Sequence, residues 1–130
     1  MADDFESECD RLSNAVDGVQ FERIRWARTE GPMLERLVEL AQATVAERPD
    51  FELTDEGSTG ACKRFVLKVH GVRVAAVNLG LEGETVTVWS EEIVRSPYKL
   101  VDPRRRTAAF ADVDEQWMAA AIQGVFSEVR

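Results

Sequence analysis

Two strand-like runs separated by His70-Gly71 restrict the fold of this chain more than any other feature of its sequence. Residues 62–69 and 72–79 are rich in apolar and β-branched side chains, which favour an extended backbone. A two-residue loop that ends in glycine suits the primed turn of a tight hairpin. The sequence therefore predicts that the two runs form an antiparallel β-hairpin.

A turn at His70 and Gly71 also predicts the register of this hairpin. One face would carry only apolar pairs: Val69 with Val72, Leu67 with Val74, and Phe65 with Ala76. The other face would carry the cationic side chains: Lys68 with Arg73, Val66 with Ala75, and Arg64 with Val77. Because successive side chains point to opposite faces, a slip of one residue would mix the two sets. We expect one apolar face and one cationic face.

A third strand is predicted at residues 85–91, after a three-residue loop that ends at Gly83. This loop length adds Val86 and Val88 to the apolar face. On the cationic face it places Trp89 beside Ala75 and Glu91 beside Arg73, where a carboxylate would relieve the repulsion between neighbouring basic residues.

Helical periodicity appears in three places. An N-terminal helix is predicted from one apolar face made of Phe5, Cys9, Leu12 and Val16. A middle helix opens at Gly31-Pro32 and stops at Pro49, and a C-terminal helix begins at Asp112. Residues 19–30 fit neither period, so a short strand and a helical turn both remain open there.

Together these elements predict one α+β domain over residues 1–130. It contains an antiparallel sheet of three to five strands (hairpin 62–69/72–79, third strand 85–91), packed with the N-terminal, middle and C-terminal helices. The expected order is helix, strand or helix, helix, four strands, helix. A short edge strand is expected at Tyr98–Val101, and Arg104-Arg105-Arg106 is expected to be a loop.

The composition points to the cytoplasm. No apolar run approaches the length that a membrane span needs, and the first residues are acidic, unlike a secretion signal. The two cysteines, Cys9 and Cys62, are interpreted as buried free thiols of a reducing compartment. We therefore expect a cytoplasmic protein that makes no membrane contact.

Charge is unevenly distributed along the chain. The net charge is −8, yet residues 57–110 carry nine basic and five acidic side chains. The acidic total disfavours non-specific contact with phosphate backbones, so nucleic acid is not an expected partner.

The residues that carry catalysis are scarce. His70 is the only histidine, and a hairpin tip is a poor position for a general base because solvent surrounds it. Asp112 and Asp114 are better explained as helix caps than as metal ligands. We expect no catalytic site, no metal and no cofactor.

The cationic sheet face is the leading candidate for function. Its predicted contact residues are Trp89, Arg73, Lys68, Arg64 and Val66. A mixture of aromatic, basic and aliphatic side chains is typical of protein-binding surfaces. The function expected is a non-catalytic protein-binding module, such as a small acidic adaptor, a chaperone-like protein or an inhibitor. The competing interpretation is that the N-terminal helix covers this face and buries Trp89.

Two other functions remain open. Arg104, Arg105, Arg106 and Lys99 form the densest basic cluster and would suit an anionic ligand, or an enzyme's anionic substrate, in a pocket between sheet and helices lined by Tyr98 or Trp117. The predicted edge near Tyr98–Val101 would suit self-association into a homodimer.

Overall fold

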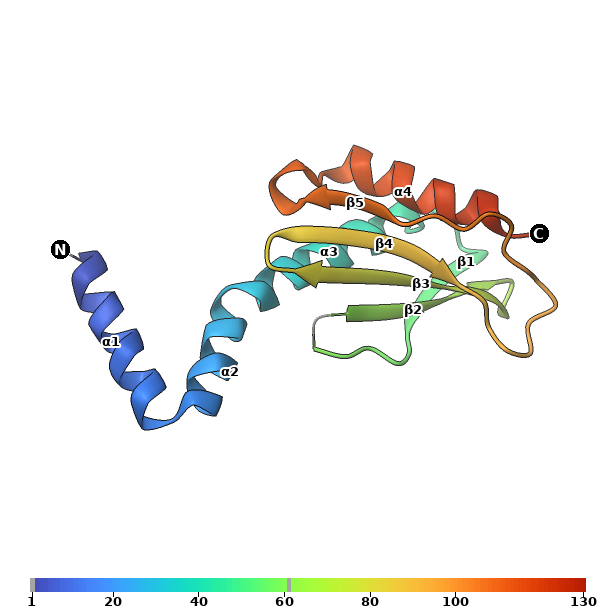
Figure 1. Cartoon of the computed structure of the whole chain (residues 1–130). Coiled ribbons are helices and arrows are strands. Elements are labelled where there is room, and N and C mark those ends of the chain that lie inside the picture. Colours follow the sequence, from blue (N-terminus) through green and yellow to red (C-terminus); the bar gives the residue numbers. More distant parts are fainter. Residues whose placement is uncertain (1, 61) are drawn as a thin grey trace. The chain divides into compact units, whose positions relative to one another are not determined.

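The computed structural model describes residues 2–60 and 62–130, and its chain divides into two compact units, residues 1–33 and 34–130 (Figure 1). The smaller unit contains α1 (Ala2–Val16) and α2 (Gly18–Arg28), which pack against each other, and the start of α3 (Glu30–Thr44). The Asp17 carboxylate caps α2 by accepting a hydrogen bond of 3.1 Å from the Gln20 N–H. Most of residues 19–30, for which the sequence left both a short strand and a helical turn open, is therefore helical. The expectation of one continuous domain stays a prediction.

The larger unit is an antiparallel sheet with two helices. Its strands are β1 (Phe51–Asp55), β2 (Cys62–Val69), β3 (Val72–Glu82), β4 (Thr85–Glu91) and β5 (Arg106–Ala109), in the spatial order β1-β2-β3-β4-β5. A 3-10 turn, η1 (Phe110–Asp112), leads into α4 (Glu115–Glu128). This architecture confirms the predicted α+β class and the order of its main elements.

The last strand is not where the sequence placed it. Residues 98–101 form no strand of the sheet, and Leu100 makes one isolated bridge to Val129 beside the C-terminus. Arg106, expected in a loop, is instead the first residue of β5. The stretch that follows it, Thr107-Ala108-Ala109, is short and weakly apolar, so its strand character was not visible in the periodicity.

The turn between β2 and β3 has the predicted geometry. His70 and Gly71 both have positive φ, 52° and 77°, as the two central residues of a type I′ turn require. The pairs nearest the turn, Val69 with Val72 and Lys68 with Arg73, are confirmed.

Beyond these pairs the predicted register is wrong by one residue. A β-bulge places Val74 and Ala75 together opposite Leu67, so that Phe65 pairs with Val77 and Val66 with Ala76. Both bulge residues are buried. An apolar residue inserted into an apolar run leaves no trace in the alternation, and the sequence therefore gave no sign of the bulge.

The predicted register of β4 is wrong as well. The β3–β4 turn has two residues, not three, with Gly83 at φ 61° in its first position. Trp89 consequently pairs with Asn78 rather than lying beside Ala75, and Glu91 pairs with Ala76 rather than lying beside Arg73. Val86 and Val88 do join the apolar face, opposite Leu81 and Leu79.

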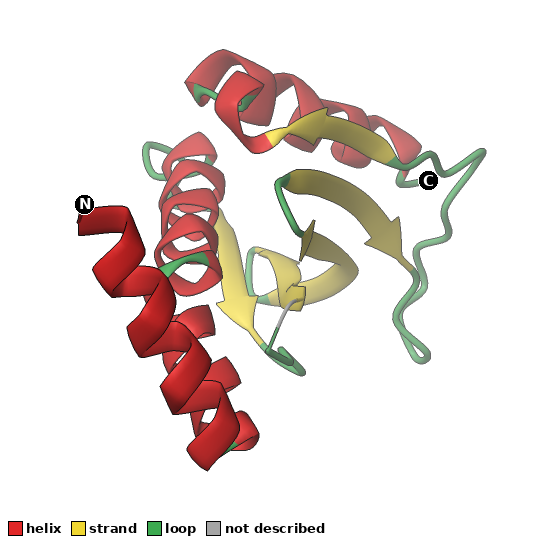
Figure 2. Ribbon diagram, turned by 60° about the vertical axis from the view of Figure 1, so that its left-hand side comes forward, coloured by secondary structure: helices red, strands yellow, loops and turns green. Residues whose placement is uncertain are grey.

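The core of the larger unit lies between one sheet face and the helices α3 and α4 (Figure 2). The sheet contributes buried side chains from β1, β2, β3 and β4: Leu53, Phe65, Leu67, Ala75, Val77, Leu79, Leu81, Val86 and Val88. The helices contribute Leu34, Leu37, Leu40, Ala41, Met118, Ala121, Ile122 and Val125. Burial of these side chains is the main source of stability for this unit.

The two ends of α4 are fixed by carboxylates. Asp114, two residues later than predicted, is the N-cap and accepts a hydrogen bond of 2.7 Å from the Trp117 N–H. At the other end Glu128 is 5 % exposed and accepts hydrogen bonds from the Ser90 hydroxyl, the Arg104 N–H and the Arg106 guanidinium, at 2.9, 2.7 and 3.3 Å. Through these hydrogen bonds Glu128 connects the end of α4 to β4 and to the start of β5.

The cysteines and the helices bear on the expected location. Both cysteines are free, but Cys9 is exposed, so the expectation of two buried thiols is wrong for this residue. Cys62 is half-buried, and burial, followed by the charge of Glu91, raises the pKa of its thiol. Within residues 2–60 and 62–130, none of the helices combines the length and the apolar character needed to cross a bilayer.

Replacing Glu128 by alanine should lower the free energy of unfolding by about 3 kcal/mol, because it leaves a half-buried guanidinium and a buried hydroxyl without their acceptor. Chemical denaturation of the purified variant measures this loss. Gln123→Ala, on the exposed side of the same helix, is the matched control and should change stability by less than about 0.5 kcal/mol. An equal, small effect of both substitutions would contradict the role given to Glu128.

Candidate functional site

The second face of the sheet is the main candidate site. Within residues 34–60 and 62–130, α3 and α4 both pack on the other face, and no helix lies on this one. We call it the Trp89 face, and its side chains are Arg64, Val66, Lys68, Arg73, Ala76, Asn78, Thr87, Trp89 and Glu91, with Glu56 and Arg105 from adjoining loops. All five contact residues predicted from the sequence are among them. Ala75 and Val77, also expected on this face, lie in the core because of the bulge.

Trp89 is held between a strand and an arginine. Its ring lies against the backbone of Gly80 on β3, where an added Cβ would come within 2.9 Å of the ring. The Arg105 guanidinium lies 4.5 Å from the ring centroid, a cation–π contact. The tryptophan is half-buried, and its ring and Arg105 border a hollow of about 300 Å³ next to Cys62 and Thr87. A fixed aromatic ring with an exposed part is thus available on the open face.

The basic side chains of the Trp89 face are paired with two carboxylates. The Arg64 Nε donates to Glu91 Oε1 over 3.1 Å, and Glu91 also accepts from the Asn78 amide. Arg73 contacts Glu56 at 2.8 Å, and the Lys68 ammonium lies 3.7 Å from the same carboxylate. The face is therefore of mixed charge, whereas the sequence predicted a predominantly cationic one. Glu56 was missed because it lies after β1, outside any strand pattern.

The centre of this face is apolar beneath its charges. Val66 and Ala76 pair across β2 and β3, and both are 0 % exposed although α3 and α4 pack on the other face of the sheet. Long charged side chains on either side can shield such residues with their aliphatic stems. The surface presented to solvent is consequently made of guanidinium, ammonium, carboxylate and indole groups.

The residues of the predicted anion-binding cluster make several separate contacts. Arg105 stacks on Trp89, while the Arg106 guanidinium binds Glu128 and lies over Gly124 on the helix side of the sheet. Arg104 contributes its backbone N–H to Glu128, and Lys99 pairs through its backbone with Arg130. The Arg105 and Arg106 guanidinium groups thus make contacts on different sides of the sheet, and an anion site made of all four residues stays a prediction.

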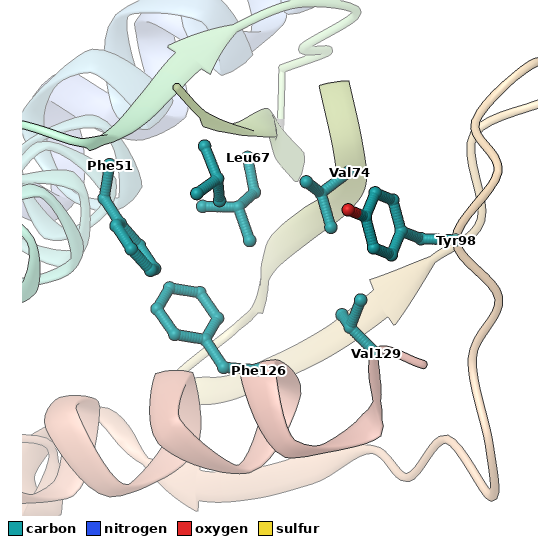
Figure 3. A pocket seen from close by; sticks show the side chains of 7 residues that line it. Phe51, Leu67, Val74, Tyr98, Phe126 and Val129 are labelled. Carbon is teal, nitrogen blue, oxygen red and sulfur yellow. The ribbon is translucent and has the colours of Figure 1, made fainter. Parts of the chain in front are cut away.

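An apolar pocket of about 280 Å³ lies between the sheet and the end of α4 (Figure 3). Its walls are Phe51, Leu67, Val69, Val74, Tyr98, Phe126 and Val129. The rings of Phe51 and Phe126 are 5.5 Å apart, and the Tyr98 ring closes the other side. Tyr98 lines this cavity as predicted, whereas Trp117 does not contribute to it. The Val74 bulge supplies part of the wall, so the same irregularity shapes both faces of the sheet.

Groups suited to catalysis are dispersed. His70 is exposed at the tip of the β2–β3 hairpin. Among the residues that the structure describes, His, Cys, Asp and Glu side chains form no group of three or more that would hold a metal ion.

Comparison of the chain with protein-family models, with curated proteins and with solved structures found no match. The Trp89 face and the apolar pocket therefore have to be interpreted from their own chemistry. The Trp89 face has the larger number of polar groups, and the pocket is almost entirely apolar.

The Glu56 carboxyl offers a direct test of the geometry of the Trp89 face. The Arg73 guanidinium, with a smaller contribution from Lys68, holds the pKa of Glu56 below its usual range. Because the folded-state pKa is depressed, the pair stabilises the fold above the ordinary pKa of glutamate and loses this effect as the pH falls through the depressed value.

Arg73→Ala should raise the pKa of Glu56 towards the ordinary value, measured by NMR titration of the side-chain carboxyl. Arg36→Ala, on the exposed side of α3, should leave it unchanged. An unchanged pKa in Arg73→Ala would mean that the pair is absent in solution.

Proposed function

We propose that this chain is a non-catalytic protein-binding module that contacts its partner through the Trp89 face. The observation that supports this most is the position of Trp89, held between Gly80 and Arg105 on a sheet face that the helices of its own unit leave open. Tryptophan and arginine are the residue types that most often dominate binding energy at protein interfaces. A side chain already fixed in place also loses little conformational entropy on binding.

The charge pattern of the Trp89 face favours a protein over a nucleic acid. A surface that binds a phosphate backbone needs cationic groups that are free to replace counterions. Here Arg64, Lys68 and Arg73 each contact a carboxylate of the same chain. A protein partner that carries both signs of charge can match such a surface, and electrostatic complementarity would then set the orientation of binding.

The type of module follows from size and charge alone. Small acidic adaptors, chaperone-like proteins and inhibitors fit a chain of 130 residues with a net charge of −8. A cytoplasmic location belongs to the same proposal, because Cys9 and Cys62 are both free.

A second candidate function is supported by the apolar pocket. Its seven wall residues are apolar apart from the Tyr98 hydroxyl, which suits a small apolar ligand or a single apolar side chain of a partner. This differs from the anionic ligand expected from the sequence, because the arginines of residues 104–106 lie outside the lining.

Trp89→Ala should weaken partner binding at least ten-fold, as expected for an aromatic anchor at the centre of an interface. The partner is first captured from a lysate of the producing cells on the immobilised wild-type chain and identified, and its affinity for purified variants is then measured by calorimetry. Arg73→Ala, which removes one charge of the same face, should weaken binding as well.

Two variants separate the competing explanations. Val101→Ser changes a hydrophobic residue that is 51 % exposed in the segment beside the end of α4, and it should bind like the wild type. Tyr98→Ala opens the apolar pocket, and it should also retain binding. Loss of the partner in Tyr98→Ala, with full binding in Trp89→Ala, would transfer the function to the pocket. Melting temperatures of all variants show whether the fold is kept.

A further inference from the structure

The strand β5 forms one edge of the sheet, and its outer backbone groups are unpaired (Figure 1). Phe110 donates its N–H to the Glu84 carbonyl over 2.7 Å, so these two residues form a hydrogen-bonded pair at the end of the β4–β5 ladder. Hydrogen-bonded and non-bonded pairs alternate along an antiparallel ladder. Thr107 and Ala109 therefore point their N–H and C=O groups away from β4. No other part of the described chain bonds to these groups.

The opposite edge of the sheet, β1, is protected by its own chain. The Gln42 side-chain amide donates to the Leu53 carbonyl over 2.9 Å, and the Phe51 N–H bonds to the Arg48 carbonyl. Capping groups and charged side chains are devices that keep sheet edges from pairing with other chains. Along residues 107–111, β5 and the turn after it carry no capping contact and no charge. The β5 edge is thus the one available for pairing.

The outer side of the neighbouring helix α4 is depleted of charge. On α3 the exposed residues include Glu35, Arg36 and Glu39. The exposed residues of α4 that follow Glu115 are instead all uncharged: Gln116, Ala119, Ala120, Gln123 and Ser127. Depletion of charged residues distinguishes the centre of an interface from ordinary surface.

The side of α4 that faces β5 carries a half-buried tryptophan. The Arg106 guanidinium of β5 lies so close to Gly124 that an added Cβ would come within 2.5 Å of it. Ala120 and Trp117 precede Gly124 by four and seven residues, and they therefore lie on the same side of the helix. Trp117 is half-buried and Ala120 is exposed. Tryptophan is among the residue types that most often dominate binding at interfaces, and here it lies on the side of α4 next to an unpaired edge.

The charges at the two ends of β5 have opposite signs. Arg104 and Arg105 precede the strand, whereas Asp112 follows it. Glu84 lies at the acidic end as well, since its carbonyl binds the N–H of Phe110. In the described part of the chain, none of these four charged side chains takes part in an ion pair. An antiparallel second copy of the strand sets each basic end beside an acidic end, whereas a parallel copy sets like charges together.

We propose that this chain forms a homodimer in which β5 pairs antiparallel with β5 of a second copy. A two-fold axis at Ala108 sets Thr107 opposite the second copy's Ala109, so that their outward N–H and C=O groups bond each other. The same axis sets Arg104 opposite the second copy's Asp112. The two five-stranded sheets then join into one continuous sheet.

This inference goes beyond the proposed function, because it concerns the β5 edge and does not depend on a contact made by Trp89. Residues opposite each other in an antiparallel pair point to the same side of the sheet, so both Trp89 faces lie on one side of the joined sheet. A partner with repeated sites can then engage both faces, which raises its apparent affinity. The sequence suggested self-association at residues 98–101, where the sheet has no strand, and the dimer proposed here uses β5 instead.

Proline at residue 109 tests the pairing without disturbing the monomer. Ala109 has φ −68° and ψ 144°, values that proline adopts, and its N–H points away from β4. Sedimentation analysis of the full chain over roughly 1 to 200 µM should show monomer converting to dimer in the wild type. Ala109→Pro, which removes a donor on each side of the axis, should weaken dimerisation by about ten-fold or more. Ala109→Ser keeps the N–H and should dimerise like the wild type.

Two results of this experiment would overturn the proposal. One is a wild-type chain that stays monomeric over the whole range of concentrations. The other is an Ala109→Pro protein that keeps the melting temperature of the wild type and also dimerises like it.

A charge exchange tests the orientation, and it decides the question even where Ala109→Pro unfolds. Arg104→Glu and Asp112→Arg each place like charges across the proposed axis, so each protein alone should dimerise roughly five-fold more weakly than the wild type. In a mixture of the two proteins the exchanged positions face each other with opposite charges, and heterodimers should form with nearly the affinity of the wild type. Arg36→Glu, on the exposed side of α3, should change neither result. A mixture that dimerises no better than each protein alone would refute the antiparallel pairing.

Discussion

The register of the β2–β3 hairpin is the constraint on which the rest of the larger unit depends. The type I′ turn at His70 and Gly71 fixes the first two pairs, and the bulge at Val74 then shifts every later pair by one residue. Because side chains alternate across a sheet, this single extra residue decides which of them enter the core. It sends Ala75 and Val77 inward and Ala76 outward, and it leaves Arg64 and Val66 on the face that carries Trp89.

The sequence predicted the elements of this fold better than their connections. Strong periodicity and glycine-containing turns located the hairpin, the third strand and the middle helix, and the α+β class followed from their order. The bulge and the two-residue turn at Gly83 escaped prediction, because an apolar insertion and a one-residue change in loop length leave similar patterns. Trp89 nevertheless stayed on the predicted face, because the register errors at the bulge and at the β3–β4 turn are each an odd number of residues, so that the second reverses the change of side caused by the first.

Long-range polar contacts were the part of the site that the sequence did not reveal. Glu56 and Glu91 pair with Arg64, Lys68 and Arg73 on the Trp89 face, and Glu128 joins the end of α4 to Ser90 and Arg106. Each of these pairs joins residues that are far apart along the chain, so no local spacing of residues predicts the contact. The run Arg104-Arg105-Arg106 consequently suggested an anion site. In the structure each of the three residues makes a different contact: Arg104 through its backbone N–H with Glu128, Arg105 with the Trp89 ring, and Arg106 through its guanidinium with Glu128.

The central claim is that Trp89 lies on an open sheet face with part of its ring in contact with solvent. Iodide quenching of its fluorescence, in a variant that keeps only this tryptophan through Trp26→Phe and Trp117→Phe, tests this most directly. Partial quenching is predicted, and quenching by neutral acrylamide should increase when Arg105→Ala removes the guanidinium that covers one side of the ring. Fluorescence that iodide leaves unchanged in both proteins would show a buried tryptophan, and it would contradict the assignment of this face as a contact surface.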